Sequence, residues 1–227
     1  MRLRTAVSQL LCAVLLGTLA LVAAPAASAT AAPAQTPLRG GTMLYSPSGR
    51  CMVAFNATNG TRYYGIMAGH CATAVGTQWY ADPRLTIPVG VTEAAVFPGQ
   101  DYALVRFTNP DYTYPSEIAA GVQVIRVNRA ANPVVGQSAC RVGPTTGTHC
   151  GTVQAVNVSV TYPQGTVHGL FRTTICAEPG DSGGPAFGGD AGLGFLVGGS
   201  GNCTLGGATY YQPLVPVLSA HGLRVGY

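Results

Sequence analysis

Short apolar runs separated by turn residues are the main pattern of this chain. Nine runs hold the β-branched and aromatic residues that favour strands. They span residues 52–55, 63–67, 86–91, 102–107, 123–127, 152–160, 170–175, 192–197 and 208–211. The clearest is 152–160, where Val156, Val158 and Val160 alternate with polar residues, as a strand with one buried face requires. The pattern predicts an all-β chain of many short strands.

A helical pattern occurs once, near the C-terminus. Pro216 stands at a position typical of the first helical residue, and Gly222 is placed to end the helix. We therefore expect a short helix over about 215–222. The stretch 108–121 holds two prolines and a terminal glycine, which is typical of a connector between two β halves.

Composition favours strands and turns over disorder. Of 227 residues, 47% are hydrophobic and 9% are charged, with 31 Gly and 16 Pro. A disordered chain has low hydrophobicity and high net charge, so this chain is expected to fold.

The first 29 residues have the pattern of a secretory signal. Two arginines open it, the apolar stretch 10–22 follows, and residues 27–29 form a small-x-small cleavage site. The alternative is a membrane anchor, but that needs about 20 apolar residues. We expect removal of 1–29, a short pro-segment or spacer over 30–39, and a secreted, extracellular protein that has no membrane partner after cleavage.

Loss of the signal changes the charge balance. It removes two arginines and no acid, so 12 basic and 8 acidic residues become 10 and 8, and the net charge falls from +4 to +2. No arginine cluster remains to release counterions from a phosphate backbone. We therefore expect no nucleic-acid partner.

Six cysteines remain after the signal: Cys51, Cys71, Cys140, Cys150, Cys176 and Cys203. They allow 15 pairings. Sequential pairing closes short loops, each worth about 3 kcal/mol by the chain-entropy model. Zinc is the alternative, because His70 and His149 each precede a cysteine, but the C-x(2–4)-C spacing of structural zinc is absent. We expect disulfides and no metal.

The strongest chemical signal is the segment 178–185, EPGDSGGP. Its serine, Ser182, has Gly180 and Gly184 at −2 and +2. Such a turn can present the serine Oγ while backbone N–H groups converge on one point, which is the geometry of an oxyanion hole.

Two orders of partner residues are compatible with such a serine. In α/β-hydrolases an Asp and then a His follow it, and here Asp190 and His221 do so. However, the remaining chain is too short and too rich in Gly and strand formers for the βα units of that fold. An esterase or lipase is therefore the weaker alternative.

The other order is His, Asp, Ser. Of the four histidines, His70 ends a strand-like run, whereas the other three lie in loops or near the chain end. Asp101 opens the apolar run 102–107, and burial there would let it hold an imidazole tautomer. The acids at 82, 93 and 111 lie in turn-like or polar contexts, so we expect them to be exposed.

These segments carry a family resemblance that extends from Gly40 onward. The chain resembles chymotrypsin-fold serine proteases, closest to the secreted bacterial streptogrisin and α-lytic branch. The matching segments are 49–51, 68–71, 101–105, 141–147, 176–185, 198–203 and 212–213. The resemblance implies a protease domain over 40–227. It would contain two six-stranded antiparallel Greek-key β-barrels, about 40–112 and about 122–214, and the short C-terminal helix.

The resemblance also implies roles for single residues. Ser182 would be the nucleophile, His70 the general base and acid, and Asp101 the partner of the imidazole. The N–H groups of Gly180 and Ser182 would form the oxyanion hole. The family's disulfides correspond to sequential pairing, and its internal arginine implies a buried Arg141–Asp181 ion pair.

Substrate preference is implied in the same way. The primary pocket and the strand that pairs with substrate would comprise Ala177, Glu178, Pro179, Leu196, Val197, Gly198, Gly199, Ser200 and Thr209. None is the Asp that favours Arg or Lys, and none is His, which would favour Glu. We expect a serine endopeptidase that cleaves after large apolar residues and needs no cofactor. Its partners would be protein or peptide substrates and protein inhibitors, and it would be a monomer.

Two positions depart from the family pattern. Val197 stands where the family usually has a serine that donates a hydrogen bond to the catalytic aspartate, and Met67 replaces a usual threonine. These departures and the short pro-segment motivate an alternative: a weak or inactive protease-fold protein that binds peptides or inhibitors.

Overall fold

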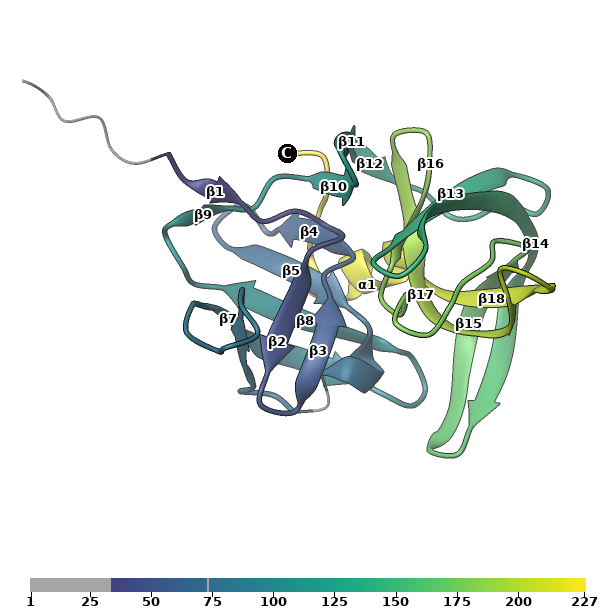
Figure 1. The fold of residues 1–227 in the computed structure, drawn as a ribbon, viewed down its shortest axis with the longest axis horizontal. Helices are drawn as coiled ribbons and strands as arrows, with labels where there is room; N and C mark the ends of the chain where they lie inside the picture. Colours follow the sequence, from purple (N-terminus) through teal and green to yellow (C-terminus); the bar gives the residue numbers. More distant parts are fainter. Residues whose placement is uncertain (1–33, 73) are drawn as a thin grey trace, which may run out of the picture. The chain divides into compact units, whose positions relative to one another are not determined.

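Two curled β-sheets build the part of the chain that the structure, a computed structural model, describes: residues 34–72 and 74–227 (Figure 1). Residues 1–33, which include the expected signal, lie outside the described residues. No helix of the described part is long and apolar enough to cross a membrane.

The first sheet holds seven strands in the order β3-β2-β6-β7-β8-β5-β4. Its strands are β2 (Met43–Ser46), β3 (Gly49–Met52), β4 (Phe55–Thr58), β5 (Tyr63–Met67), β6 (Gln78–Tyr80), β7 (Pro88–Val96) and β8 (Tyr102–Phe107). The two edge strands, β3 and β4, follow each other along the chain, so together they count as one strand of a six-stranded antiparallel barrel. Trp79, Phe55 and Ile66 are fully buried in its core.

The second sheet has the order β12-β17-β16-β13-β14-β15-β18, and an added β17–β18 pairing closes it. Its strands are β12 (Arg129–Ala130), β13 (Ser138–Gly143), β14 (Gly147–Tyr162), β15 (Gly165–Thr173), β16 (Pro185–Gly188), β17 (Ala191–Asn202) and β18 (Gly206–Pro213). Because β12 only pairs in parallel with β17, the barrel itself consists of the six antiparallel strands β13 to β18. The predicted all-β, two-barrel fold is confirmed.

The segment between the two barrels forms β-strand pairs and is therefore not a plain connector. Strand β9 (Tyr112–Thr113) pairs in parallel with β1 (Thr36–Pro37), and β10 (Glu117–Ala120) forms a hairpin with β11 (Gln123–Arg126). Leu38 is buried as well. Residues 36–39, expected as part of a spacer, are therefore integrated into the fold.

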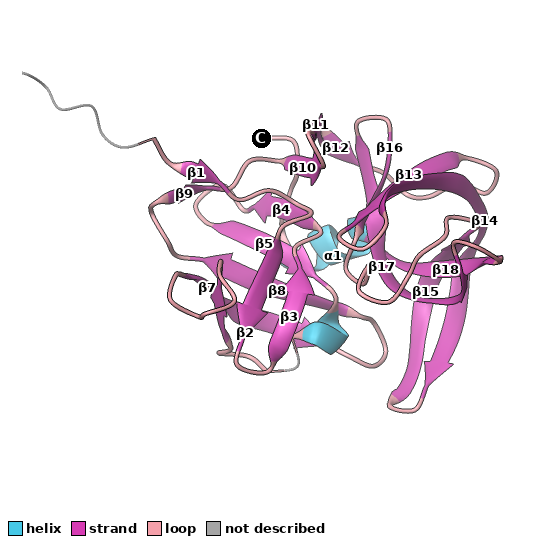
Figure 2. Cartoon of the chain, viewed as in Figure 1, coloured by secondary structure: helices cyan, strands magenta, loops and turns pink. Residues whose placement is uncertain are grey.

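The C-terminal helix α1 (Leu214–His221) is drawn in cyan in Figure 2. It ends at Gly222, whose φ of 60° is the left-handed cap that the sequence predicted. Its start differs from the expectation: Pro213 is the N-cap, so the helix begins at Leu214 and Pro216 is the third helical residue, not the first. Proline is tolerated there because first-turn N–H groups have no intrahelical acceptor.

The long strand β14 departs from the predicted alternation. Val156 is 42% exposed, whereas Val158 and Val160 are half-buried. The pairing with β15 shifts register between Ala155 and Val158, and Asn157 has a φ of 55°. A β-bulge thus turns Val156 outward, which the sequence alternation did not reveal.

Candidate active site

His70 and Asp101 meet at one end of the first barrel. His70 lies in the short 3-10 turn Gly69–Cys71 that follows β5, and Asp101 directly precedes β8. The Asp101 Oδ2 is 2.7 Å from the His70 Nδ1, and Oδ1 accepts a 2.9 Å hydrogen bond from the His70 N–H. Asp101 is completely buried. The pair can fix the tautomer and orientation of the imidazole.

Ser182 lies in the loop between β15 and β16 of the second barrel. No hydrogen bond joins its Oγ to His70 within residues 34–72 and 74–227. Such contacts are often long without substrate and tighten in the complex.

Within residues 180–184, two backbone amides have no acceptor in the described part of the protein. The N–H groups of Asp181, Gly183 and Gly184 each donate to a backbone carbonyl. Those of Gly180 and Ser182 have no protein acceptor among the described residues. Gly180 has a φ of 100°, a conformation that favours glycine. The two free donors are those predicted to form the oxyanion hole.

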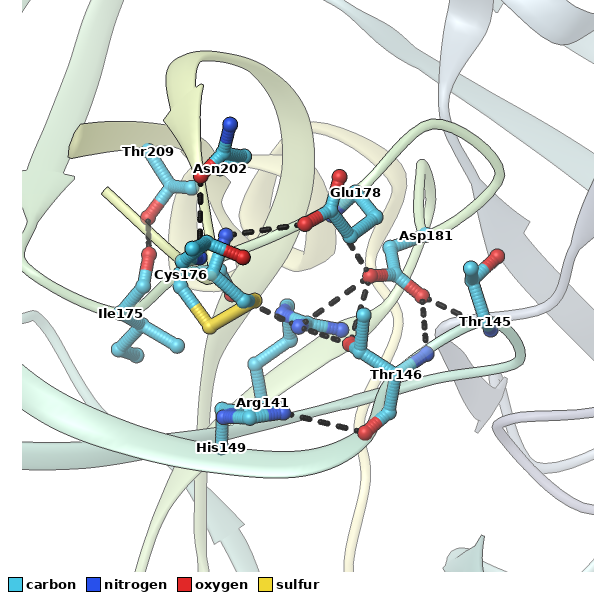
Figure 3. Close-up of a disulfide and its surroundings, with 12 residues drawn as sticks. Arg141, Thr145, Thr146, His149, Ile175, Cys176, Glu178, Asp181, Asn202 and Thr209 are labelled. Atoms are coloured by element: carbon cyan, nitrogen blue, oxygen red, sulfur yellow. Dashed lines mark hydrogen bonds and ion pairs between the residues drawn. A yellow bond between two sulfur atoms is a disulfide. The ribbon is translucent and has the colours of Figure 1, made fainter. Parts of the chain in front are cut away.

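A buried ion pair joins this loop to β13. Arg141 on β13 and Asp181 are both fully buried, with Nη2 3.3 Å from Oδ2 (Figure 3). Gly143 leaves room for them, because a Cβ there would collide with both side chains. Burial alone would raise the pKa of Asp181. Hydrogen bonds from the Glu178 N–H and the Thr146 hydroxyl, with the charge of Arg141, nevertheless hold this pKa below its ordinary value.

Eight of the nine predicted substrate-binding residues line one cavity with Ser182. This cavity of about 210 Å³ is lined by Ala177, Glu178, Pro179, Ser182, Leu196, Gly198, Gly199, Ser200, Gly201 and Thr209. Gly201 was not predicted. Val197 instead lines a neighbouring cavity of about 400 Å³ with His70, Asp101, Phe97, Tyr162 and Gln164. A larger cavity, about 530 Å³, is lined by Tyr63, by residues of the segment 107–115 and by none of the predicted residues, so volume alone does not locate the chemistry.

The sequence did not indicate Phe97 or Tyr162. Phe97 lies edge-on to the His70 ring at 5.9 Å, and the Tyr162 hydroxyl donates to the Val197 carbonyl at 3.4 Å. Burial first, and then the charge of Asp101, raise the pKa of Tyr162. The two aromatic residues come from different barrels, so only the fold brings them together.

The structure joins the cysteines sequentially: Cys51–Cys71, Cys140–Cys150 and Cys176–Cys203. The third disulfide ties the pocket wall at Cys176 to the end of β17, and the Cys203 N–H donates to the Glu178 carboxylate at 3.0 Å (Figure 3). His149 lies within 4.8 Å of both sulfurs. Because they are joined in a disulfide, they offer no thiolate to a metal.

The α/β-hydrolase order is not assembled around Ser182. His221, at the end of α1, pairs with the Tyr102 hydroxyl at 3.1 Å. Asp190 pairs with Arg129 at 3.5 Å and with Asn128. Neither side chain lines the cavity of Ser182.

Comparisons with known proteins agree with this geometry. The family described as Trypsin matches residues 39–219. Streptogrisin-C of Streptomyces griseus is 45% identical over 83% of this chain and 41% of its own length. Glutamyl endopeptidase 2 of the same organism is 40% identical over 82% of this chain and 98% of its own. The solved structure of alpha-lytic protease homolog N4 has 54% identity and a TM-score of 0.78, covering 83% of this chain and 99% of that one. The chain spans about half the length of the streptogrisins C and D that it matches.

Proposed function

Because the chain belongs to the trypsin family of serine proteases, we propose that it is a secreted serine endopeptidase that acts through His70, Asp101 and Ser182. The observation that carries the proposal is the 2.7 Å His70–Asp101 contact, together with the free amides of Gly180 and Ser182. The three disulfides support secretion, since disulfides persist in oxidising compartments.

The proposed reaction hydrolyses a peptide bond in two stages. The Ser182 Oγ attacks the scissile carbonyl while the His70 Nε2 takes the proton of the serine hydroxyl, and Asp101 stabilises the imidazolium that forms. The N–H groups of Gly180 and Ser182 stabilise the oxyanion, and each such donor is worth about 3–4 kcal/mol in serine proteases. His70 then protonates the leaving amine. Water, activated by the same imidazole, releases the acyl group and restores the serine.

We propose that the protein prefers substrates with a large apolar residue on the acyl side of the cleaved bond. Ala177, Pro179 and Leu196 supply apolar walls, and the Glu178 carboxylate is held by the Cys203 N–H. One relative is named a glutamyl endopeptidase, so glutamate is the competing preference. The cavity lining contains no histidine to bind a glutamate side chain. Peptides that differ only at this residue distinguish Phe or Leu from Glu and Arg, and faster cleavage after Glu or Arg contradicts this preference while leaving hydrolysis intact.

A fluorophosphonate probe tests the nucleophile. The purified protein should be labelled, Ser182→Ala should not, and its kcat should fall by roughly 10⁶-fold. Ser159→Ala is the matched control, because Ser159 lies 2.9 Å from His168 in an exposed Ser–His pair on the β14–β15 hairpin. A folded wild type that is never labelled would instead support the alternative, a protease-fold protein that binds peptides or inhibitors without turnover.

A further inference from the structure

Asp101 has an unusual distribution of hydrogen bonds. Both bonds to its carboxylate come from His70, through the backbone N–H and Nδ1. Val197 lines the cavity that also holds His70 and Asp101, but it has no hydroxyl to donate a third hydrogen bond to the carboxylate. Since His70 and Asp101 both belong to the first barrel, these bonds do not place the pair relative to Ser182 in the second.

One side chain of the second barrel contacts Asp101 directly. The Gln212 Oε1 accepts a 3.0 Å hydrogen bond from the Asp101 backbone N–H. Gln212 lies on β18, 111 positions along the chain, and is 2% exposed. A backbone N–H can only donate, so the amide must present its oxygen to Asp101.

The backbone of Gln212 is held firmly. It pairs with Phe195 of β17, and β17 also carries Leu196 of the pocket wall. The next residue, Pro213, caps α1. The strand that builds the substrate pocket therefore has a rigid link to the aspartate of the other barrel.

We infer that Gln212 is a positioning residue that fixes the Asp101–His70 pair relative to Ser182; this inference rests on the proposed function. Without the amide oxygen, the buried Asp101 N–H would lack an acceptor and the segment before β8 could shift. A shift of about 1 Å in catalytic geometry can cost 10²-fold in rate. Substrate binding to the second barrel would be little affected.

The test compares variants that keep or remove the oxygen. Gln212→Met is close in length but offers only a weak sulfur acceptor. We expect kcat to fall by about 10- to 100-fold with KM within about threefold of wild type. Gln212→Glu should restore most of kcat, because its carboxyl presents an oxygen to the Asp101 N–H in either protonation state. If Gln212→Met does not fold, Gln212→Asn, whose oxygen is withdrawn by one methylene, should show the same loss of kcat.

The matched control is Asn56→Ala. Asn56 is a buried amide of the first barrel that donates to the Leu38 and Pro115 carbonyls, away from Asp101. It should lower stability and leave kcat unchanged. A wild-type kcat in the folded Gln212→Met or Gln212→Asn variant, or no recovery in Gln212→Glu, would overturn the inference.

A second readout is independent of turnover. The His70 Nδ1 proton that is shared with Asp101 should give a far-downfield NMR resonance. We expect this resonance to be lost or shifted in Gln212→Met but kept in Asn56→Ala. If the wild type shows no Ser182-dependent hydrolysis, the proposed function fails, and the NMR resonance alone then decides the role of Gln212. An unchanged resonance in Gln212→Met would overturn the inference that Gln212 positions the His70–Asp101 pair.

Discussion

The carboxylate of Asp101 is buried, and both of its hydrogen bonds come from one residue, His70. A buried carboxylate normally gains from further donors, and a hydrogen bond to a charged group contributes about 1.5–3 kcal/mol. Position 197 is the place to add one, because Val197 is buried and lines the cavity that holds Asp101 and His70.

We predict that Val197→Ser raises kcat by about three- to tenfold, since a hydroxyl donor would stabilise the ionised aspartate beside the imidazolium. Steady-state kinetics on one apolar peptide measures the change. Val197→Ala is the matched control, because it removes the same methyl groups without adding a donor and should not gain activity. Equal rates for the two variants would show that the missing hydroxyl does not limit the rate of hydrolysis.

At the residue scale, the sequence was informative where chemistry requires a rare residue type. Four histidines and one serine with glycines at both −2 and +2 leave few combinations, and the structure brings His70 to Asp101 as the predicted order requires. The contacts of Gln212 and Tyr162 could not be predicted, although 212–213 is one of the segments that carry the family resemblance. A glutamine or tyrosine within a strand carries no local mark of a contact formed more than 30 positions away.

The bulge in β14 governs the geometry of the β14–β15 hairpin. This hairpin contacts the first barrel near the site: the Gly99 N–H donates to the Thr166 carbonyl at 3.0 Å, and the His168 N–H donates back to Gly99 at 2.8 Å. Asn157, with a φ of 55°, makes the bulge possible, because asparagine tolerates this left-handed conformation better than other residues with a side chain.

We therefore predict that Asn157→Val lowers the free energy of unfolding by about 1–2 kcal/mol, the cost of placing a β-branched residue in that conformation. Asn157→Gly should be tolerated within about 0.5 kcal/mol. Urea unfolding measures both. Gln154→Val, at an exposed position of the same strand, controls for added valine and should stay near wild type. If Asn157→Val is as stable as the control, the bulge does not need a left-handed residue.

At the scale of elements, the apolar runs indicated many of the strands but missed β2, β6, β13 and β16, and they did not reveal register. The run at 152–160 correctly indicated a strand, but one inserted residue reversed the orientation of Val156. The run at 52–55 falls at the junction of β3 and β4, where the chain bends between sheet edges. Apolar periodicity reports burial, and both a bulge and a bend satisfy burial without keeping the period.

The chain has few charged residues, and the fully buried ones among the described residues lie at the candidate site. Asp101, Arg141 and Asp181 are completely buried, whereas the Arg106–Glu93 pair is largely exposed. The two-barrel fold could be anticipated because many motifs of one family occur in one order. Physical reasoning from strands and turns alone predicted only an all-β chain, since the pairing of distant strands leaves no local signal.

The buried Asp181 makes the stability of the whole molecule depend on pH. Its pKa in the folded protein lies below the ordinary value of 3.8, although burial opposes this, because the hydrogen bonds from Glu178 and Thr146 and the charge of Arg141 prevail. Below pH 3.8 the Asp181 carboxylate is therefore protonated in the unfolded chain while it is still ionised in the folded protein. The stabilisation is complete above that value and is lost as pH falls through the folded pKa.

We predict that the wild-type free energy of unfolding, measured by urea titration from pH 6 to pH 2, falls more steeply below about pH 4 than that of Asp181→Asn. The variant should be less stable at pH 6, because Arg141 loses its buried partner, and the two curves should converge toward pH 2. Asp111→Asn changes the net charge equally in an exposed loop and should run close to wild type throughout. Parallel curves for wild type and Asp181→Asn would mean that Asp181 is not the group through which acid destabilises the fold.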